Sequence, residues 1–304
     1  MSGTVAIVGS GEEALNLAEE LADAGHFTEV VVYGRQPETP SHTVFARGLA
    51  RYVFGLEPFS RDTLAVFLAV PETGIPEIAF SVAGQGDAPP GCAAFHMSPV
   101  LPTEALAPLH PRGYALGSFH PLGSPADTGT ARSESSVTGA IRGGFVAVTG
   151  SPSAVGVARR ITDALEARVL EVPAGRRPLV DAATVMVGSY LDPLMALSSR
   201  LMERAGVPSE DAAPALVAVA RASLDRLDRG DPRTAPGNPV LEGDVERVAL
   251  HLRALDAEDQ RLYALLATEI LRLSADEQAL DPETRHAMEE LLARYTHLEP
   301  TNVG

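Results

Sequence analysis

The chain has 304 residues, of which 45% are hydrophobic and one, Cys92, is a cysteine. Its formal net charge of −16 comes from 40 acidic and 24 basic residues. Nucleic acids and anionic membranes attract clustered Lys and Arg, so we expect neither as a partner of so acidic a chain. A single cysteine excludes an internal disulfide framework and a cysteine-based zinc site, and it favours a cytoplasmic location.

Membrane insertion and secretion are not expected either. No stretch of about 18 apolar residues is free of charge and proline, so we expect no membrane-spanning segment. The first residues lead directly into a strand pattern and lack the basic-then-apolar order of a signal peptide.

The first half of the chain alternates between short apolar runs and helical patterns. Residues 4–8 are an apolar run that ends in glycines, and residues 12–25 follow with the apolar stripe of a helix. The runs are continuous and not alternating, which is typical of strands buried on both faces of a parallel sheet. We therefore predict an α/β fold with a Rossmann-like, mostly parallel sheet over residues 1–173. Further strands are expected at 28–35, 50–56, 63–71, 92–99, 114–122, 143–150 and 168–172, a helix at 153–167, and a long loop at 123–143.

After Pro173 the strand signals stop, and an all-helical domain is predicted for residues 174–304. Residues 179–205 predict one long helix that Pro193 kinks, and Ser209 is the expected N-cap of the next. The helix that begins at Ser209 has an alanine-rich apolar face, which includes Leu216 and Val219. Such a face is typical of packing against helices of the same chain or of a second copy, and we expect a homodimer. Three more helices are expected after a Gly/Pro-rich break at 230–243, at 245–255, 259–273 and 282–295.

The turn after the first strand carries the most specific motif. Gly9, Ser10, Gly11 and Ala14 fit the G-x-G-x-x-A pattern between a strand and a helix, which predicts a dinucleotide-binding turn. Gly9 permits the tight turn, and Gly11 lets backbone amides approach a pyrophosphate. The helix N-terminus adds positive partial charge.

Two acids in this turn leave its function open. Glu12 and Glu13 either stabilise the helix dipole from the solvent side or repel the phosphates of a nucleotide. At the end of the second strand, where an acidic residue would accept the ribose hydroxyls of NAD, the chain has Arg35. A guanidinium suits a 2′-phosphate and favours NADP, although Arg35 is also compatible with an ordinary surface turn.

Several stretches together resemble a known family. The strand end Leu68–Pro71 resembles the place beside which the nicotinamide lies in 6-phosphogluconate dehydrogenase-like enzymes. The motif His96-Met97-Ser98 and residues 104–109 and 117–122 resemble one group of that superfamily, which has a Rossmann-like N-terminal domain and a helical C-terminal domain of unassigned function. Residues 181–194 and 235–252 resemble it too, so that the resemblance spans residues 4–272. Distant relatives are ketopantoate, pyrroline-5-carboxylate and imine reductases.

The resemblance implies a nicotinamide cofactor with Val70, Pro71 and His96 beside it, and Arg35 favours NADP as that cofactor. Many members of the group have His and Asn where this chain has Asp181 and Ser189, and Glu12 replaces an uncharged or basic residue. Imine reductases often use Asp or Tyr on the corresponding helix as a proton donor, which implies that role for Asp181.

Asp181, Ser189 and two histidines are the candidate catalytic groups. Asp181 and Ser189 are eight residues apart on the predicted long helix and share a broad face, although an acid near a helix start is also often a solvated one. His96 and His120 follow apolar runs, at the strand ends where open α/β sheets bind ligands; either is alternatively a turn histidine packed on proline. Arg176-Arg177 is interpreted either as a clamp for a substrate carboxylate or as a solvated pair.

The resulting functional hypothesis is an NADP-dependent reductase of a small keto or imino compound. Asp181 or His120 would supply the proton, and Ser189 would orient the substrate. No metal motif occurs, and Ser189 lacks the glycines of a hydrolase elbow. The alternative is a catalytically inactive relative that binds a nucleotide or small ligand, or acts as an assembly partner.

Overall fold

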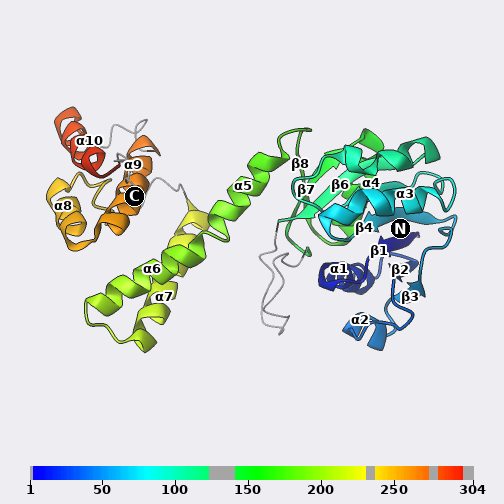
Figure 1. Cartoon of the computed structure of the whole chain (residues 1–304). Helices are drawn as coiled ribbons and strands as arrows, with labels where there is room; N and C mark the ends of the chain where they lie inside the picture. The colour runs from blue at the N-terminus through cyan, green and yellow to red at the C-terminus, as the bar shows by residue number, and fades with distance from the viewer. Residues whose placement is uncertain (1–2, 123–140, 231–236, 274–279, 297–304) are drawn as a thin grey trace, which may run out of the picture. The chain divides into compact units, whose positions relative to one another are not determined.

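The structure is a computed structural model that describes residues 3–122, 141–230, 237–273 and 280–296 (Figure 1). Most of the loop predicted at 123–143 lies outside these residues. Contacts divide the chain into two units, residues 1–192 and 193–304, and each is described by itself.

The first unit is built on an eight-stranded sheet in the order β3-β2-β1-β4-β5-β6-β7-β8. Strand β7 runs antiparallel to β6, and all other neighbouring strands are parallel. The predicted α/β class with a mostly parallel sheet is thus confirmed. The strands are β1 (Thr4–Val8), β2 (Glu29–Gly34), β3 (Arg51–Phe54), β4 (Thr63–Leu68), β5 (Ala93–His96), β6 (Ala115–Pro121), β7 (Phe145–Gly150) and β8 (Arg168–Glu171).

Helices cover both faces of the sheet, which explains why the strands are apolar on both sides. One face packs against α1 (Glu12–Asp23), α2 (Thr43–Ala46) and α4 (Pro152–Ala164). The other packs against α3 (Ile75–Ala83), which follows the short 3₁₀ helix η1 (Glu72–Gly74), and against η2 (Thr103–Arg112).

A buried carboxylate joins α1 to the segment that precedes β7. Glu20 of α1 accepts hydrogen bonds from the backbone amides of Ile141, at 2.7 Å, and Arg142, at 2.9 Å. Hydrogen bonds to a charged acceptor are among the stronger ones, so this contact fixes where the chain re-enters the sheet.

The long helix predicted at 179–205 is interrupted. Helix α5 spans Arg177–Val187 and α6 spans Leu191–Arg204, with a turn between them. Pro193 is the third residue of α6 and does not kink a continuous helix. Proline lacks the amide that would bond four residues back and its ring crowds that carbonyl, so the break lies one turn upstream of it. The predicted boundary near 173 lies just after β8, whereas the contacts group α5 with the sheet.

The second unit has its core in its last three helices, α8 (Val245–Ala254), α9 (Ala257–Leu273) and α10 (Pro282–Thr296). Helix α6 has no buried residue, and α7 (Ser209–Arg229) buries Ala212 alone. Ser209 is the first residue of α7 and makes no cap hydrogen bond, so the N-cap prediction is wrong. None of the helices in the described ranges is long and apolar enough to span a membrane. The buried hydrophobic core comprises Val240, Val248, Leu252, Ala264, Ala267, Leu271, Met288 and Leu292.

Candidate functional site

The turn between β1 and α1 has the geometry expected of a dinucleotide-binding loop. Gly9 has φ +135°, and a Cβ there would lie 2.0 Å from the carbonyl oxygen of Ala69, so glycine is required. Gly11 caps the helix with φ −75°, and a Cβ there would meet no atom of the described residues within 4 Å. No described residue therefore crowds Gly11, and the N-terminus of a helix offers unpaired backbone amides to an anion.

The two acids of the turn lie in different surroundings. Glu12 is exposed, whereas Glu13 is half-buried, and burial raises the pKa of the Glu13 carboxyl above its usual range. A carboxylate that already loses hydration in the first turn opposes an incoming phosphate more than a solvated one does. Removal of the Glu13 charge is therefore expected to favour a bound phosphate more than removal of the Glu12 charge.

The residues predicted to contact the rest of a dinucleotide follow the neighbouring strands. Arg35 is exposed directly after β2, in a turn held by the Tyr52 hydroxyl, which donates a 2.7 Å hydrogen bond to the carbonyl of Gln36. Val70 and Pro71 follow β4, and Pro71 caps η1. Because β1, β2 and β4 are adjacent and parallel, all these segments lie at one edge of the sheet.

A hydrogen-bond network fixes the loop after β5. The Ser98 hydroxyl donates to the Glu72 carboxylate and accepts from the amides of Val100 and Leu101, at 3.2 and 3.0 Å. The buried guanidinium of Arg177 donates to the carbonyl of Leu101, at 2.8 Å, and to that of Ser98. Arg177 thus fastens the start of α5 to this loop. The solvated interpretation is therefore wrong for Arg177, although Arg176 is exposed, and the role of a carboxylate clamp stays a prediction.

His120 and Asp181 face the same region. The Nδ1 of His120 lies 3.2 Å from the carbonyl oxygen of Met97, which assigns the ring proton to Nδ1 and leaves Nε2 as an acceptor. Burial lowers the pKa of His120, and the Met97 carbonyl opposes this; Arg177 lowers it further, and Asp181 is among the groups that raise it. The charge of Asp181 also raises the pKa of Arg177, although burial of the guanidinium has the larger, opposite effect. A histidine and a carboxylate therefore lie within electrostatic reach of each other at the sheet edge.

His96 and Ser118 form a second, deeper polar pair. They are opposite each other on the parallel strands β5 and β6, and both are fully buried. Neither ring nitrogen of His96 nor the Ser118 hydroxyl makes a hydrogen bond to any described residue. Burial lowers the pKa of His96 to about 4 and the charge of Arg177 adds to this, against an opposing effect of the Pro102 backbone. His96 is therefore a neutral imidazole at pH 7, without access to solvent.

Ser189 does not lie on a helix with Asp181. It is exposed in the turn between α5 and α6, beside the exposed Tyr190, because α5 ends at Val187. The shared helical face predicted for Asp181 and Ser189 is therefore wrong, while the role of Ser189 stays a prediction.

Sequence reasoning missed the positioning roles of Glu72 and Ser98 and the buried Ser118. Ser98 and Ser118 stand in the motifs that carried the family resemblance, but serine is common in turns and strands. Glu72 is 26 residues from Ser98 in the chain. Nothing in its local pattern distinguishes it from a surface acid.

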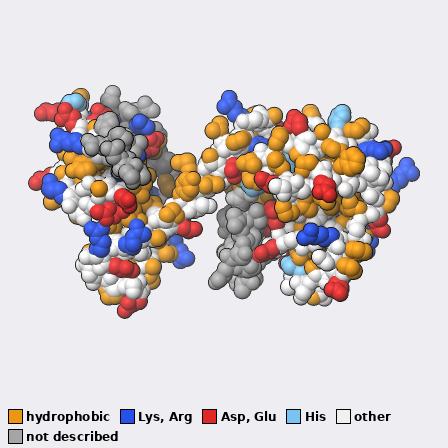
Figure 2. Space-filling view, in the orientation of Figure 1, with side chains coloured by type: hydrophobic (Ala, Val, Ile, Leu, Met, Phe, Trp, Pro, Cys, Tyr) orange, Lys and Arg blue, Asp and Glu red, His pale blue; other side chains and the backbone are white. Residues whose placement is uncertain are grey.

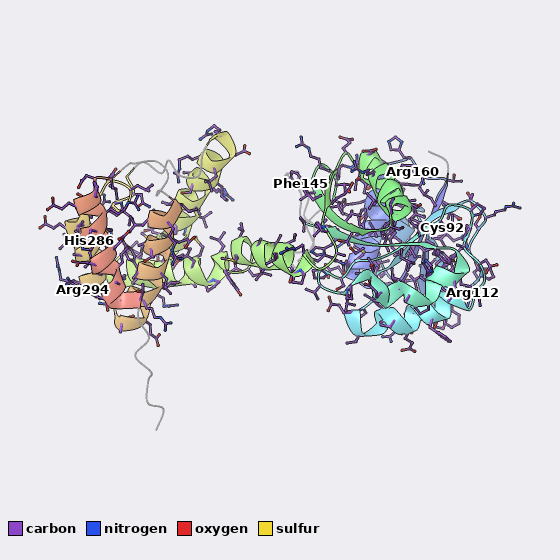
Figure 3. All side chains as sticks on the ribbon, turned by 90° about the horizontal axis from the view of Figure 1, so that it is seen from above. Cys92, Arg112, Phe145, Arg160, His286 and Arg294 are labelled. Carbon is purple, nitrogen blue, oxygen red and sulfur yellow. The ribbon has the colours of Figure 1, made fainter. Side chains whose placement is uncertain are left out.

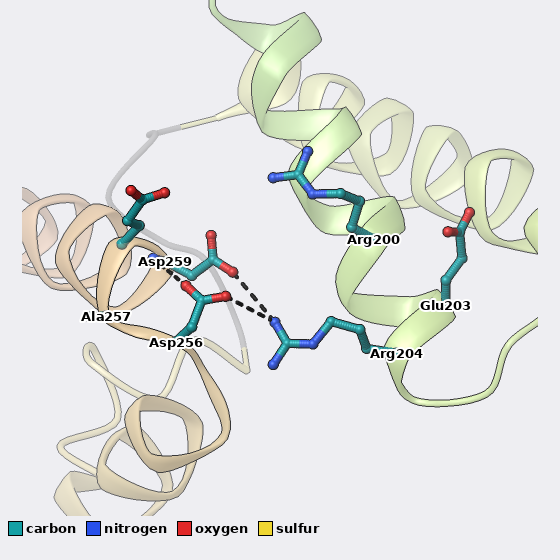
Figure 4. A pocket seen from close by; sticks show the side chains of 7 residues that line it. Arg200, Glu203, Arg204, Asp256, Ala257 and Asp259 are labelled. Carbon is teal, nitrogen blue, oxygen red and sulfur yellow. Dashed lines mark hydrogen bonds and ion pairs between the residues drawn. The ribbon is translucent and has the colours of Figure 1, made fainter.

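A charged surface cavity and the buried Cys92 are not part of the carboxyl edge of the sheet. A surface cavity of about 740 Å³ in the second unit is lined by charged side chains that pair with each other, since Arg204 lies 3.2 Å from Asp256 and 3.6 Å from Asp259 (Figure 4). Cys92 is buried within the sheet unit (Figure 3), where burial raises the pKa of its thiol to about 12. No cluster of three potential metal ligands occurs among the described residues.

A family model described as "Domain of unknown function (DUF2520)" matches residues 145–270, from β7 into α9. The chain therefore joins a Rossmann-like sheet to a helical region of unassigned function, as the resemblance implied. No curated protein sequence gives a significant match.

Solved structures share the fold over nearly the whole chain. A protein of Bacteroides fragilis provisionally named an NADP oxidoreductase has 21% identity and a TM-score of 0.64, over 88% of this chain and 97% of its own. A protein of Thermotoga maritima has 16% identity and a TM-score of 0.67, over 90% and 99%. An imine reductase of Myxococcus stipitatus in complex with NADP+ has 15% identity and a TM-score of 0.54, over 97% and 100%. At these identities the comparisons show the fold alone.

Proposed function

We propose that the chain is an NADP-dependent reductase of a small keto or imino compound. The observation that carries the proposal is the arrangement at the carboxyl edge of the sheet. The glycine turn of Gly9 and Gly11 lies at this edge, and so does His120. The carboxylate of Asp181 is close enough to raise the pKa of His120. Ligands of open α/β sheets bind at this edge, and the similar imine reductase holds NADP+.

The glycine turn suits a dinucleotide in its backbone geometry, whereas the negative charges of Glu12 and Glu13 oppose the phosphates. Gly9, Ser10 and Gly11 would hold the pyrophosphate, Arg35 the 2′-phosphate, and Val70 and Pro71 the nicotinamide side. The cofactor, when bound, supplies the hydride. The half-buried Glu13 weakens phosphate binding, so affinity is expected to rise when its charge is removed.

The protonation step falls to His120 and Asp181. Reduction of a C=O or C=N bond needs a proton delivered to the heteroatom. Nε2 of His120 is free to carry that proton, because Nδ1 is engaged by Met97. Asp181 stabilises the protonated ring, since its charge raises the pKa of His120. Ser189 would orient the substrate from the turn after α5.

An inactive ligand-binding protein is the second candidate, and Glu13 favours it. A carboxylate that is half-buried in a phosphate turn is expected in a loop that no longer holds a dinucleotide. In that case the fold would serve a different ligand or an assembly.

Calorimetric titration of the full chain with NADPH and NADH tests the proposal. We expect NADPH to bind about tenfold more tightly, which corresponds to about 1.4 kcal/mol. Arg35→Ala should remove that preference and leave NADH affinity unchanged. Glu13→Gln should raise both affinities, and Glu12→Gln, at an exposed site, should raise them less.

Absence of binding to the wild-type chain and to Glu13→Gln alike would exclude the reductase. If NADPH binds, the pH profile of imine or ketone reduction follows. Reduction should accelerate as the pH falls, because more His120 becomes protonated, and His120→Gln should flatten the profile. A profile that His120→Gln leaves unchanged would assign the proton to another group.

A further inference from the structure

We propose that His96 and Ser118 bind one buried water molecule, which orders the loop after β5 and so positions His120. The inference holds whether or not the chain is a reductase. It rests on two buried polar side chains that lie opposite each other without a hydrogen bond. It also rests on the place of His96 in the chain, directly before the residue whose carbonyl orients His120.

A polar row crosses one face of the sheet near the ends of β5 and β6. His96 and Ser118 are register partners, and Ser118 is in turn the partner of Thr149 on β7. Register partners point to the same face of a sheet, and successive residues of a strand point to opposite faces. Phe95 and Phe119, which adjoin His96 and Ser118 in the chain, accordingly stack in the core on the other face. The three polar side chains therefore lie side by side.

Two members of this row leave their polar atoms without partners. Both ring nitrogens of His96 and the Ser118 hydroxyl make no hydrogen bond to any described residue, and both side chains are fully buried. The Thr149 hydroxyl, by contrast, donates a 2.7 Å hydrogen bond to the carbonyl of Val172. Nearly all buried polar groups of folded proteins are bonded either to protein or to an ordered water. The orphaned pair therefore indicates a small bound molecule between the ring and the hydroxyl.

Charge selects water as that molecule. Burial and the charge of Arg177 lower the pKa of His96, so the ring is neutral at pH 7 and does not hold an anion by its charge. The same guanidinium disfavours a cation nearby. Acidic side chains are spread over the surfaces of both units in Figure 2, and the net charge of −16 does not attract anions. A water is neutral and needs two to four polar partners, which the row supplies.

The hydrogens of this site can be assigned. The Pro102 backbone raises the pKa of His96, so the ring nitrogen on that side carries the hydrogen and the other nitrogen keeps its lone pair. The water donates one hydrogen to that lone pair and accepts the hydrogen of the Ser118 hydroxyl. Its second hydrogen goes to the Thr149 oxygen, which still has lone pairs because its own hydrogen is donated to Val172. One water thus bonds to three side chains of the row.

The water site adjoins the group that orients His120. Met97 directly follows His96 in the chain, and its carbonyl oxygen lies 3.2 Å from Nδ1 of His120. The same carbonyl raises the pKa of His120. His120 is two residues after Ser118 on β6 and therefore lies on the same face of the sheet. Anchoring the His96 ring thus fixes the Met97 carbonyl at the distance that His120 needs.

Two variants that each delete one buried hydroxyl test the water site. Thr63, the first residue of β4, also has a buried hydroxyl without a partner among the described residues, but its register partner Thr4 already donates to Asp62 at 3.2 Å. Thr63→Val therefore removes an isolated unpaired group and should leave stability unchanged or raise it. Ser118→Ala removes a ligand of the water and should raise the unfolding equilibrium constant in urea about tenfold. A constant that stays the same or falls in Ser118→Ala, as in Thr63→Val, would overturn the proposal.

A high-resolution crystal structure of the unaltered chain decides the case if Ser118→Ala does not fold. We expect one density peak within about 2.7–3.2 Å of a His96 ring nitrogen and of the Ser118 oxygen. Crystals soaked in bromide should show no anomalous signal there, because water does not exchange for the halide. Absence of the peak, or an anomalous signal that reveals an anion, would contradict a bound water.

The positioning role is tested by the titration of His120. In Ser118→Ala the Met97 carbonyl is held less firmly and supports the protonated ring less, so the pKa of His120 should fall below its wild-type value. Thr63→Val should leave it unchanged. Histidine-selective NMR titration of the full chain measures both, and His120→Gln identifies the signal. An unchanged pKa of His120 in a destabilised Ser118→Ala variant would show that the water does not position His120.

Discussion

At the scale of single residues, the two glycines of the turn after β1 have different roles: Gly9 is required for folding, whereas Gly11 is expected to serve binding. Gly9→Ala places a methyl group against the Ala69 carbonyl at a positive φ, so we expect a loss of stability on the order of 3 kcal/mol or more. Gly11→Ala meets no described atom, and alanine is only a poorer N-cap than glycine, so it should destabilise by about 0.5–1 kcal/mol, well below Gly9→Ala, while weakening NADPH binding. Urea unfolding and calorimetry compare the two; equal destabilisation by both would contradict the assignment.

His96 gives the sheet a sensitivity to acid. Its folded-state pKa is about 4 against 6.5 when unperturbed, so the unfolded chain binds the proton more readily. Stability should therefore fall as the pH drops from about 6.5 towards 4, by on the order of 3 kcal/mol at most. His96→Gln should flatten this dependence in urea unfolding between pH 4 and 7.5. The exposed His110→Gln serves as the control, and an unchanged slope in His96→Gln would rule out His96 as the source.

At the scale of elements, Arg177 is what attaches α5 to the sheet unit. Arg177→Met leaves the carbonyls of Ser98 and Leu101 without their donor, so we expect a destabilisation on the order of 2–4 kcal/mol. Hydrogen exchange should accelerate in residues 97–102 and 177–187. Arg176→Met, at the exposed neighbour, should change neither quantity. Fast exchange confined to α5 would show that the loop after β5 holds its shape alone.

The elements also show what the sequence could and could not predict. All eight strands were predictable because each is a short apolar run beside a turn. Gly9 and Gly11 were predictable because a dinucleotide-binding turn requires glycines at this spacing. The end of α5 was not, because Pro193 acts on a carbonyl four residues earlier. The network of Glu72, Ser98 and Arg177 was also hidden. It joins residues up to 79 positions apart, and only the sheet order brings them together.

At the scale of the whole molecule, the two units have separate cores. Leu252 is fully buried among α8–α10. Leu252→Ala should therefore destabilise that core by about 2–5 kcal/mol and leave the sheet unaffected. Hydrogen exchange resolved by segment measures both in one sample. The matched Leu271→Ala should act on the same helices, whereas Phe95→Ala should act on the sheet. Equal losses in both units from any one variant would show that they unfold as one.

The sheet order has a consequence for how the chain is made on the ribosome. After β1, the chain adds β2 and β3 outward on one side; β4 then returns to pair with β1, and β5 to β8 follow in sequence on the other side. Every strand from β2 onward thus finds its neighbour already synthesised. A nascent chain can extend the sheet as it emerges, since domains generally form from the N-terminus during synthesis. Helices α5, α6 and α7 are translated after all eight strands and before α8–α10. The loop whose carbonyls bind Arg177 is therefore already present when α5 emerges.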